Sequence, residues 1–348
     1  MADLGIDVML LSIGPDLPYL TGYEAMPLER LTMLVVPDGA DAVLLVPRLE
    51  APRVVEHADA FRLEVWDETE DSVGKVVAYA GAARRAAIGD HTWARFVLAL
   101  QCEMPSTEFV TSHDVVGPLR IVKDEDEVNR LRDAARAVDE IATELRNWPF
   151  VGRREVDVHR EIVERMLDLG HERANFAIVG SGPNAASPHH EPGDRVIREG
   201  DTIVCDFGGT MRGYCSDITR TFVVGAPPSE VSDAYAVLID AQEAGVRAAR
   251  VGEHCEAVDA AARRVIADAG LGEYFVHRTG HGIGMEAHED PYIVAGNELA
   301  LAPGHAFSIE PGIYVPGRFG MRLEDIVVAT AGGPERLNHA PRELAVVA

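Results

Sequence analysis

The stretch DTIVCDFGGTMRGYCSDITRTFVVG, residues 201–225, predicts a strand, a glycine-containing turn and a returning strand. Asp206 directly follows the apolar run TIVC, which predicts that it lies at the end of the first strand, and Asp217 lies on the returning strand. An unpaired carboxylate in such a place is costly to bury because it loses its hydration. The two aspartates are therefore candidates for a functional site.

A second stretch, HAFSIEPGIYVPGRFGMRLEDIVVAT, residues 305–330, has a similar layout. Gly200 precedes Asp206 by six positions, and Gly304 precedes Glu310 by six positions. The returning strand of this second stretch brings another acid, Glu324. This weak internal repeat predicts two similar halves that face one site, the alternative being a chance similarity of two hairpins.

Two arginines lie close in sequence to these candidate acids: Arg220 is three residues past Asp217, and Arg322 is two residues before Glu324. Salt bridges to these arginines are the structural alternative to a functional site. Two arginines cannot neutralise four converging carboxylates, whereas two divalent cations would balance the charge. A set of carboxylate oxygens with one imidazole suits Mn²⁺, Co²⁺, Fe²⁺ or Zn²⁺ and differs from a thiolate zinc site.

The imidazole comes from a histidine-rich stretch, HRTGHGIGMEAHEDP, residues 277–291, which contains His277, His281 and His288. The glycines at every second position around His281 disfavour a helix, so the seven-residue spacing to His288 is not two turns of one helix face. We expect these glycines to let backbone and substrate approach the metals closely. His277 is expected to be structural, and His159, among charges in a predicted helix, to lie on the surface.

The rest of the chain predicts an α/β (α+β) protein of two domains, 1–119 and 120–348. In the first, the apolar runs Leu31–Pro37 and Asp41–Pro47 flank a turn and predict a hairpin. The boundary is placed before a stretch with apolar residues at helical spacing, in which the charges occupy the other face. Further helices are predicted at residues 154–170, 229–250 and 256–269.

Composition limits the classes of partner. The 348 residues carry a formal net charge of −25, which disfavours nucleic acids and anionic membranes because both need clustered basic residues. The N-terminus lacks the basic start of a signal peptide and no apolar run is long enough to span a membrane, so a cytoplasmic protein is expected. The four cysteines form no C-x-x-C pair and are expected to be reduced.

Four motifs together resemble the metal-binding motifs of the M24 metallopeptidases, a family that includes Xaa-Pro dipeptidases (prolidases), Xaa-Pro aminopeptidases and methionine aminopeptidases. These motifs are CDFGGTMRGYCSDITRTF, HRTGHGIG, SIEPGIY and RLEDIVV. The resemblance covers residues 120–348 and implies the pita-bread fold. The N-terminal stretch is similar, less specifically, to the accessory domain of the prolidase and aminopeptidase P branch, which methionine aminopeptidases normally lack.

The resemblance implies a metal site of five ligands. Asp217 and Glu324 would bridge two metal ions, Asp206 would bind one of them, and His281 and Glu310 would bind the other. Glu310 would also carry a proton from the attacking water to the leaving amine, as a carboxylate beside a metal-bound water can do. All five residues are present, unlike in the creatinase branch, which lacks the metal ligands.

The resemblance also implies groups that contact the substrate. His189, in the step PHH, and His288 would act in catalysis by hydrogen-bonding the substrate carbonyl or the tetrahedral intermediate. Arg322 is expected to contact substrate as well. His190, next to His189, is expected to be solvated or to support the site from behind.

The function implied is hydrolysis of Xaa-Pro bonds by a metal-bound hydroxide, in free dipeptides by preference. Two divalent ions are expected as cofactors, manganese first, with cobalt, zinc or iron(II) as alternatives. The other functions considered are an Xaa-Pro aminopeptidase on longer peptides, a small-molecule hydrolase or lyase on the same metal scaffold, and a non-catalytic binding module. The partner expected besides a small peptide is a second copy of the chain in a homodimer.

Overall fold

The computed structural model describes all residues from 1 to 348, and they form two compact units, Met1–Arg120 and Ile121–Ala348. The first unit is built on one six-stranded sheet with the order β4-β3-β2-β1-β5-β6. Its strands are β1 (Val8–Leu11), β2 (Met33–Pro37), β3 (Val43–Pro47), β4 (Arg62–Trp66), β5 (Arg85–Ile88) and β6 (Glu108–Thr111). Its helices are α1 (Asp16–Thr21), α2 (Ser72–Ala80), α3 (Ala94–Glu103) and α4 (His113–Arg120), with short 3₁₀ turns η1 (Ala2–Leu4) and η2 (Ala51–Arg53).

Both faces of the central part of this first sheet are buried, because β1 and β3 are apolar and buried at every position. In β1, Val8 and Leu10 pack toward α2 and α3, whereas Met9 and Leu11 pack on the opposite face beside α1 and α4. The predicted hairpin is confirmed, since β2 and β3 pair in antiparallel fashion. The unit is therefore a three-layer α/β structure.

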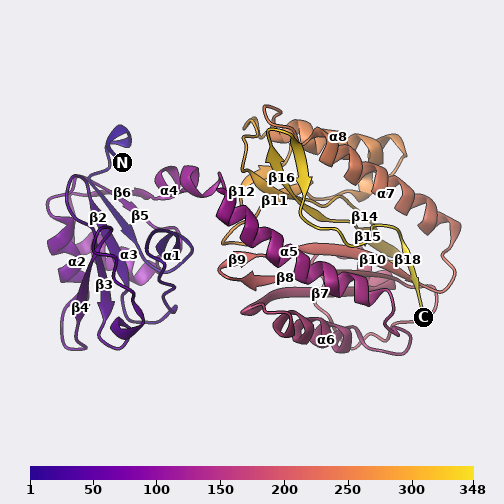
Figure 1. Ribbon diagram of the computed structural model, residues 1–348, viewed down its shortest axis with the longest axis horizontal. Helices are drawn as coiled ribbons and strands as arrows, with labels where there is room; N and C mark the ends of the chain where they lie inside the picture. The colour runs from indigo at the N-terminus through magenta and orange to yellow at the C-terminus, as the bar shows by residue number, and fades with distance from the viewer. The chain divides into compact units, whose positions relative to one another are not determined.

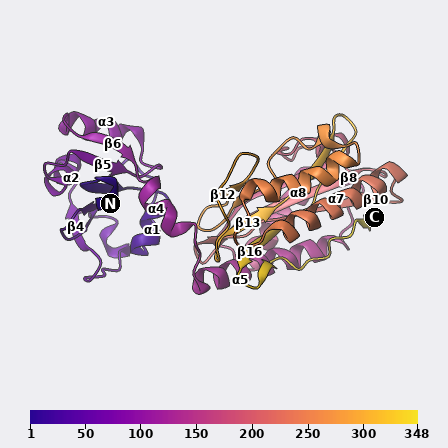
Figure 2. The same cartoon turned by 90° about the horizontal axis from the view of Figure 1, so that it is seen from above.

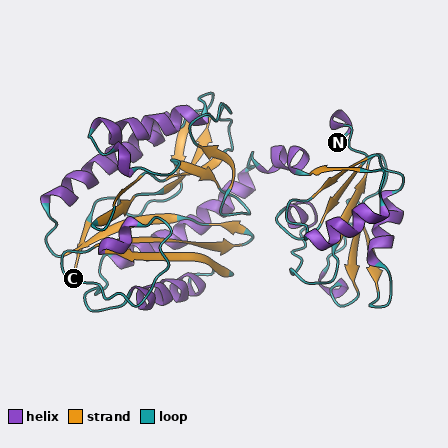
Figure 3. Cartoon of the chain, turned by 180° about the vertical axis from the view of Figure 1, so that it is seen from behind, coloured by secondary structure: helices purple, strands orange, loops and turns teal.

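The second unit contains two larger sheets, with the orders β18-β10-β8-β7 and β12-β11-β13-β16-β17, and a separate hairpin of β14 and β15. Figure 3 shows these strands in orange between the helices. Its helices are α5 (Glu125–Leu145), α6 (Glu155–Asp168), α7 (Ser229–Ala248) and α8 (Cys255–Asp268), with η3 (Gly182–Ala186) and η4 (Gly272–Tyr274). Its strands are β7 (Arg173–Ser181), β8 (Thr202–Met211), β9 (Tyr214–Cys215), β10 (Ile218–Val224), β11 (Gly280–Gly282), β12 (Glu289–Ile293), β13 (Ala306–Ile309), β14 (Gly312–Val315), β15 (Phe319–Arg322), β16 (Asp325–Thr330), β17 (Gly333–Arg336) and β18 (Ala345–Val347).

Helix α5 joins the cores of the two sheets. Asp124 and Glu127 form a reciprocal capping box that satisfies backbone N–H groups at its start. Toward its N-terminus, Leu131 packs with residues of β13 and β16, whereas toward its C-terminus, Ile141 and Leu145 pack with β8 and β10. One amphipathic helix thus contributes to both hydrophobic cores, and it crosses in front of the strands in Figure 1.

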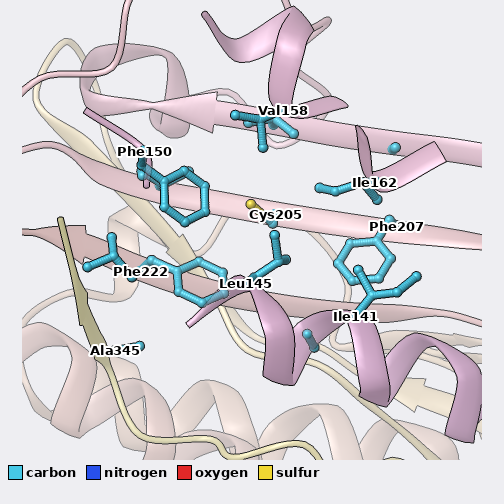
Figure 4. Packing of buried hydrophobic residues seen from close by; sticks show 14 of the residues in the cluster. Ile141, Leu145, Phe150, Val158, Ile162, Cys205, Phe207, Phe222 and Ala345 are labelled. Carbon is cyan, nitrogen blue, oxygen red and sulfur yellow. The ribbon is translucent and has the colours of Figure 1, made fainter. Parts of the chain in front are cut away.

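The alternation of strand β8 sets the direction of its aspartate. Cys205 and Phe207 point into a cluster with Ile141 of α5 and Ile162 of α6, as Figure 4 shows. Because successive side chains of a strand point to opposite faces, Asp206 points away from this cluster. The apolar face of β8 therefore stabilises the fold, and its other face is available for chemistry.

Helices α7 and α8 lie side by side and cover the second sheet (Figures 1 and 2). Val246 of α7 and Val258 of α8 pack against Phe307 and Val327 of that sheet. No helix of the structure has both the length and the apolar character needed to cross a membrane.

Three predictions about local structure need correction. Asp206 is not at the end of its strand, because β8 continues to Met211. Asp217 and Glu324 do not lie on returning strands but directly precede β10 and β16. His159 is half-buried rather than on the surface, and its Nδ1 is 2.6 Å from the carbonyl oxygen of Ala177.

Candidate metal and catalytic site

The polar face of β8 and β10 supplies the first half of the site. Asp206 lies on this face of β8, and its cross-strand neighbour in β10 is Thr219. Asp217 directly precedes β10 and is buried. Because Ile218 and Phe222 take the apolar face of β10, Thr219 and Thr221 are directed to the other face. The aspartates therefore project from the sheet on the side opposite α5 and α6.

The second sheet supplies the other half by the same alternation. In β13, Phe307 and Ile309 pack into the core under α7 and α8, which turns Ser308 the other way. The Ser308 hydroxyl donates to Glu310 Oε1 at 2.9 Å and accepts from the His281 backbone N–H at 3.0 Å. Glu310 directly follows β13, and His281 is the central residue of β11.

The two sheets meet where Thr219 pairs with Glu324 in an isolated bridge. The Thr219 hydroxyl donates to Glu324 Oε2 at 2.6 Å, and the Glu324 backbone N–H donates to the Thr219 carbonyl at 3.2 Å. Potential ligand atoms of Asp217, His281 and Glu324 all lie within 4.8 Å of one another. This spacing allows the three residues to bind one ion.

The remaining two predicted ligands border this group of three. Glu310 Oε1 is 3.1 Å from His281 Nε2, and Asp217 Oδ2 is 3.9 Å from the same nitrogen. Asp206 accepts a short hydrogen bond from Arg322 through Oδ2, while its buried Oδ1 has no hydrogen-bond partner. The structure thus brings all five residues to one place, with Asp206 at the edge beside Arg322.

The electrostatics of the site show a shortage of positive charge. Burial is the largest cause that raises the pKa of Asp217 and of Glu324 well above the ordinary range. The neighbouring carboxylates add to this effect, Glu324 first for Asp217 and Glu310 first for Glu324. A buried carboxyl in this condition binds a proton or a metal ion.

The contact between His281 and Glu310 also requires a cation. His281 Nδ1 lies 3.1 Å from the carbonyl oxygen of Gly282, so this nitrogen carries a proton and donates it. In a neutral imidazole, Nε2 then has a lone pair that faces the carboxylate of Glu310. Burial acts to raise the pKa of Glu310, but the hydrogen bond and charge of His281 outweigh burial, and the pKa falls to about 2. Either a proton on Nε2 or a metal ion between the two groups would remove the repulsion between these two hydrogen-bond acceptors.

Unsatisfied oxygens support the metal interpretation. Asp206 Oδ1 and Glu324 Oε1 are both buried and lack a hydrogen-bond partner. Since buried polar atoms are nearly always satisfied, two unpaired oxygens in one cluster fit ligands of a cation. The donor set is four carboxylates and one imidazole, as divalent Mn²⁺, Co²⁺, Fe²⁺ or Zn²⁺ prefer.

The two arginines make different contacts from those that their sequence neighbours suggest. Arg220 donates to Asp325 at 2.8 Å and to the Glu324 carbonyl at 2.6 Å, so it does not neutralise Asp217. Arg322 is buried, and besides Asp206 it donates to the hydroxyls of Tyr314 and Thr219 and to the carbonyl of Pro188. All of these contacts are within the protein, so the predicted contact of Arg322 with substrate stays a prediction.

The two predicted substrate-side histidines have exposed side chains near this cluster. The rings of His288 and His281 have centroids 3.9 Å apart. Partial burial, followed by the charge of His281, lowers the pKa of His288 to about 4, and the charge of His189 contributes in the same direction. His288 is therefore a neutral imidazole at pH 7, and His189 is close enough to influence it.

The glycines around His281 allow close approach of neighbouring protein atoms, and their expected role toward metals and substrate stays a prediction. A Cβ atom added to Gly280 would lie 1.9 Å from the carbonyl oxygen of Ser308. Gly280 therefore allows β11 to pass close to β13, which brings His281 next to Ser308. The prediction that this stretch is not helical is confirmed.

Sequence reasoning missed a hydrogen-bonded chain at the edge of the site. The His277 Nδ1 donates to the Arg278 carbonyl, so its Nε2 accepts from the Tyr314 hydroxyl at 2.9 Å. Tyr314 in turn accepts from Arg322 at 2.7 Å, and burial raises the pKa of Tyr314 to about 12. Tyr314 stands in the quoted motif SIEPGIY, but nothing in the spacing indicated its partners.

Comparisons with known proteins agree with this arrangement. The family described as Metallopeptidase family M24 matches residues 129–331, and the Creatinase/Prolidase N-terminal domain matches residues 1–122. The chain is 47% identical to "Probable dipeptidase PepE" of Mycobacterium tuberculosis (strain ATCC 25618 / H37Rv), with 99% of this chain and 93% of that protein covered. It is 35% identical to "Xaa-Pro dipeptidase" of Lactobacillus delbrueckii subsp. lactis, with 99% and 95% covered.

Solved structures give the same result for the fold. A recombinant prolidase from Thermococcus sibiricus superposes with a TM-score of 0.93 at 35% identity, covering 99% of this chain and 95% of that one. The predicted mixed α/β class, with a pita-bread unit after an N-terminal domain, is confirmed. The chain belongs to metallopeptidase family M24.

Proposed function

We propose that the chain is an Xaa-Pro dipeptidase that uses two divalent metal ions. The observation that carries this proposal is the cluster of buried carboxylates with unpartnered oxygens on Asp206 and Glu324. The names of relatives that share nearly the whole chain length, "Xaa-Pro dipeptidase" and prolidase, support the choice of substrate. Manganese is the first choice of ion, with cobalt, zinc and iron(II) as alternatives.

In this proposal the residues hold the metals as the family resemblance implies. Asp206, Asp217, His281, Glu310 and Glu324 would together hold the two ions. When bound, the ions would supply Lewis acidity that polarises the scissile carbonyl and lowers the pKa of a water molecule.

The acid–base work falls to Glu310. As a carboxylate beside the attacking water, it can accept a proton from that water. It then delivers this proton to the leaving nitrogen, which must be protonated because the amine of proline is a poor leaving group as an anion. Ser308 holds the Glu310 carboxylate in place by donating to Oε1.

The exposed imidazoles would act on the substrate side. His288 is neutral at pH 7, so one ring N–H can donate to the carbonyl oxygen of the substrate or of the tetrahedral intermediate. His189 would play the matching part from the segment that follows η3. For Arg322 we propose that it acts through Asp206, which it orients and partly neutralises.

Proline at the second position suits such a site for a chemical reason. The bond before proline is a tertiary amide without an N–H, so an enzyme that must hydrogen-bond this N–H cannot use it. Polarisation of the carbonyl and protonation of the nitrogen require no N–H. We further propose that the protein works in the cytoplasm as a homodimer, in keeping with its acidic composition and the resemblance to its family.

The test is a comparison of three peptides with the Mn²⁺-loaded protein. We expect hydrolysis of an Xaa-Pro dipeptide, weaker cleavage of Xaa-Pro-Yaa and none of the matched Xaa-Ala dipeptide. Preference for Xaa-Pro-Yaa would make the protein an Xaa-Pro aminopeptidase instead. No release of the N-terminal residue from either prolyl peptide would refute a proline-specific peptidase and favour a small-molecule hydrolase or a binding module.

A further inference from the structure

A buried glutamate outside the metal cluster, Glu155, holds the segment that leads to His189. Glu155 is the first residue of α6 and is fully buried. Its Oε1 accepts from the Ser181 backbone N–H at 2.8 Å and from the Ser181 hydroxyl at 2.6 Å. The Asn184 amide contacts both carboxylate oxygens at 3.1 Å, and His190 Nε2 lies 2.8 Å from Oε2.

This set of donors explains why a carboxylate can be buried at this position. Each contact to Glu155 comes from an N–H or O–H group, so none of them repels the negative charge. The position in the first turn of α6 adds the favourable field of the helix N-terminus. Because a carboxylate only accepts, His190 must carry its proton on Nε2 and donate it to Glu155.

The contacts fix the backbone on both sides of His189. On one side, the Pro188 carbonyl accepts from Arg322 at 3.2 Å. On the other side, the His190 side chain is tied to Glu155, and its backbone N–H donates to the Ser187 carbonyl at 3.2 Å. His189 itself is exposed and its ring makes no hydrogen bond with the protein. The orientation of the His189 side chain is therefore set by the contacts of Pro188 and His190.

The start of the same segment is held by close packing. A Cβ atom on Gly320 of β15 would lie 1.8 Å from the carbonyl oxygen of Ala185 in η3, so only glycine allows this approach. The first half of the segment is thus pressed against β15, and the second half depends on the link between His190 and Glu155.

We propose that Glu155 and His190 form a positioning pair that holds His189 toward the substrate. The inference rests on the proposed function, since it assigns a purpose to His189 in peptide hydrolysis. Neither Glu155 nor His190 touches the reacting atoms in this arrangement. Their loss should therefore lower turnover without removing the metal ions.

Matched substitutions at His190 test the pair in the full-length, Mn²⁺-loaded protein. His190→Gln places an amide N–H near the position of Nε2 and should keep kcat within about threefold of the wild type. His190→Leu has similar size but no donor, and we expect kcat to fall by about 10- to 100-fold, since small misplacements of catalytic groups have effects of this order. KM and the bound manganese should stay within about twofold. Glu155→Gln should resemble His190→Leu, because one of its two oxygens becomes a donor that faces other donors.

Hydrogen exchange gives a readout that does not depend on activity. In His190→Leu, a peptide covering residues 182–191 should exchange faster than in the wild type, while peptides from α6 and β8 should be unchanged. His190→Gln should restore the protection. If Glu155→Gln does not fold, the two His190 variants still decide the question.

The outcomes separate this inference from the proposed function. Wild-type protein that fails on every prolyl peptide would overturn both. If the wild type is active and His190→Leu has the same kcat, or loses activity only together with its manganese or its global stability, the positioning pair is refuted and the peptidase proposal stands. A fall in kcat with retained manganese, local loss of protection and rescue by glutamine supports the pair.

Discussion

The buried ion pair between Lys123 and Glu289 provides a quantitative test of how the site is supported. The Lys123 side chain is 1% exposed and that of Glu289 is 8% exposed, with Nζ and Oε1 2.5 Å apart. Glu289 opens β12 and directly follows His288, while Lys123 stands just before the cap of α5. Lys123→Met keeps the length of the aliphatic chain and removes the charge.

The expected loss follows from the burial of the remaining carboxylate. Removing one partner of a buried pair costs about 3–5 kcal/mol, because the other charge stays in a poorly solvated place. For a unit of this size each kcal/mol lowers the melting temperature by about 2–4 °C, which gives a decrease of roughly 6–20 °C. Lys123→Met/Glu289→Gln should recover most of the loss, since it removes the buried negative charge as well.

Urea and thermal unfolding measure these variants, with Arg132→Met as the control. Arg132 and Glu335 also form an ion pair, but both side chains are more than a third exposed, so the loss there should be at most about 1 kcal/mol. If Lys123→Met lies within that same range, or the double variant is no more stable than the single one, the reasoning from burial is wrong. Activity of the variants then reports whether a shift of β12 reaches His288.

Three further predictions concern the site and its surroundings. Binding of Mn²⁺ to metal-free protein should release up to two protons from Asp217 and Glu324, because burial raises the pKa of both carboxyls. Calorimetry in buffers of different ionisation enthalpy measures the number of protons released. Binding heats that do not depend on the buffer would contradict this release. Glu310→Gln should lower kcat about 10²- to 10⁴-fold while the fold stays intact, and surviving turnover would exclude Glu310 as proton carrier. Burial, followed by the charge of Lys123, lowers the pKa of His305 to about 4. Below pH 6.5 the folded chain therefore binds fewer protons at this residue than the unfolded chain. The stability that is present above pH 6.5 is lost as the pH falls toward 4. Between pH 7.5 and 5, the free energy of unfolding should fall by about 2 kcal/mol because of this histidine. His305→Asn keeps an acceptor for the Ala302 N–H and should remove this pH dependence. If urea unfolding shows the same pH dependence for the variant and the wild type, His305 is not its origin.

The sequence predicted the elements well wherever one residue pattern decides them. The apolar positions of α5 repeat at helical spacing, and its start is marked by Asp124 and Glu127, so this helix could be predicted from local residues alone. The position of Asp206 within its strand could not. The apolar run stops at Cys205, but β8 continues because Phe207 is paired on both sides, with Ala177 and with Ile218.

Partners far apart in sequence were also out of reach. Arg220 lies three residues from Asp217, yet it pairs with Asp325, because the alternation of β10 directs its side chain away from that aspartate. Arg322 lies two residues from Glu324, yet it pairs with Asp206 on the other sheet. Which of these acids receives a cation depends on how the two sheets meet, and no single stretch of sequence contains this information.

The way the sheets meet also explains why the site should depend on metal ions. Strand alternation directs Thr219 from one sheet and Ser308 from the other toward the same place, and each hydroxyl orients one carboxylate, Glu324 or Glu310. These neutral donors fix the geometry of the acids but do not cancel their charge, and only Asp206 has an arginine. The same packing that gives the fold its two apolar cores therefore brings uncompensated negative charge together between the sheets. Divalent ions would relieve this repulsion, so metal binding should contribute to the stability of the second unit as well as to its chemistry.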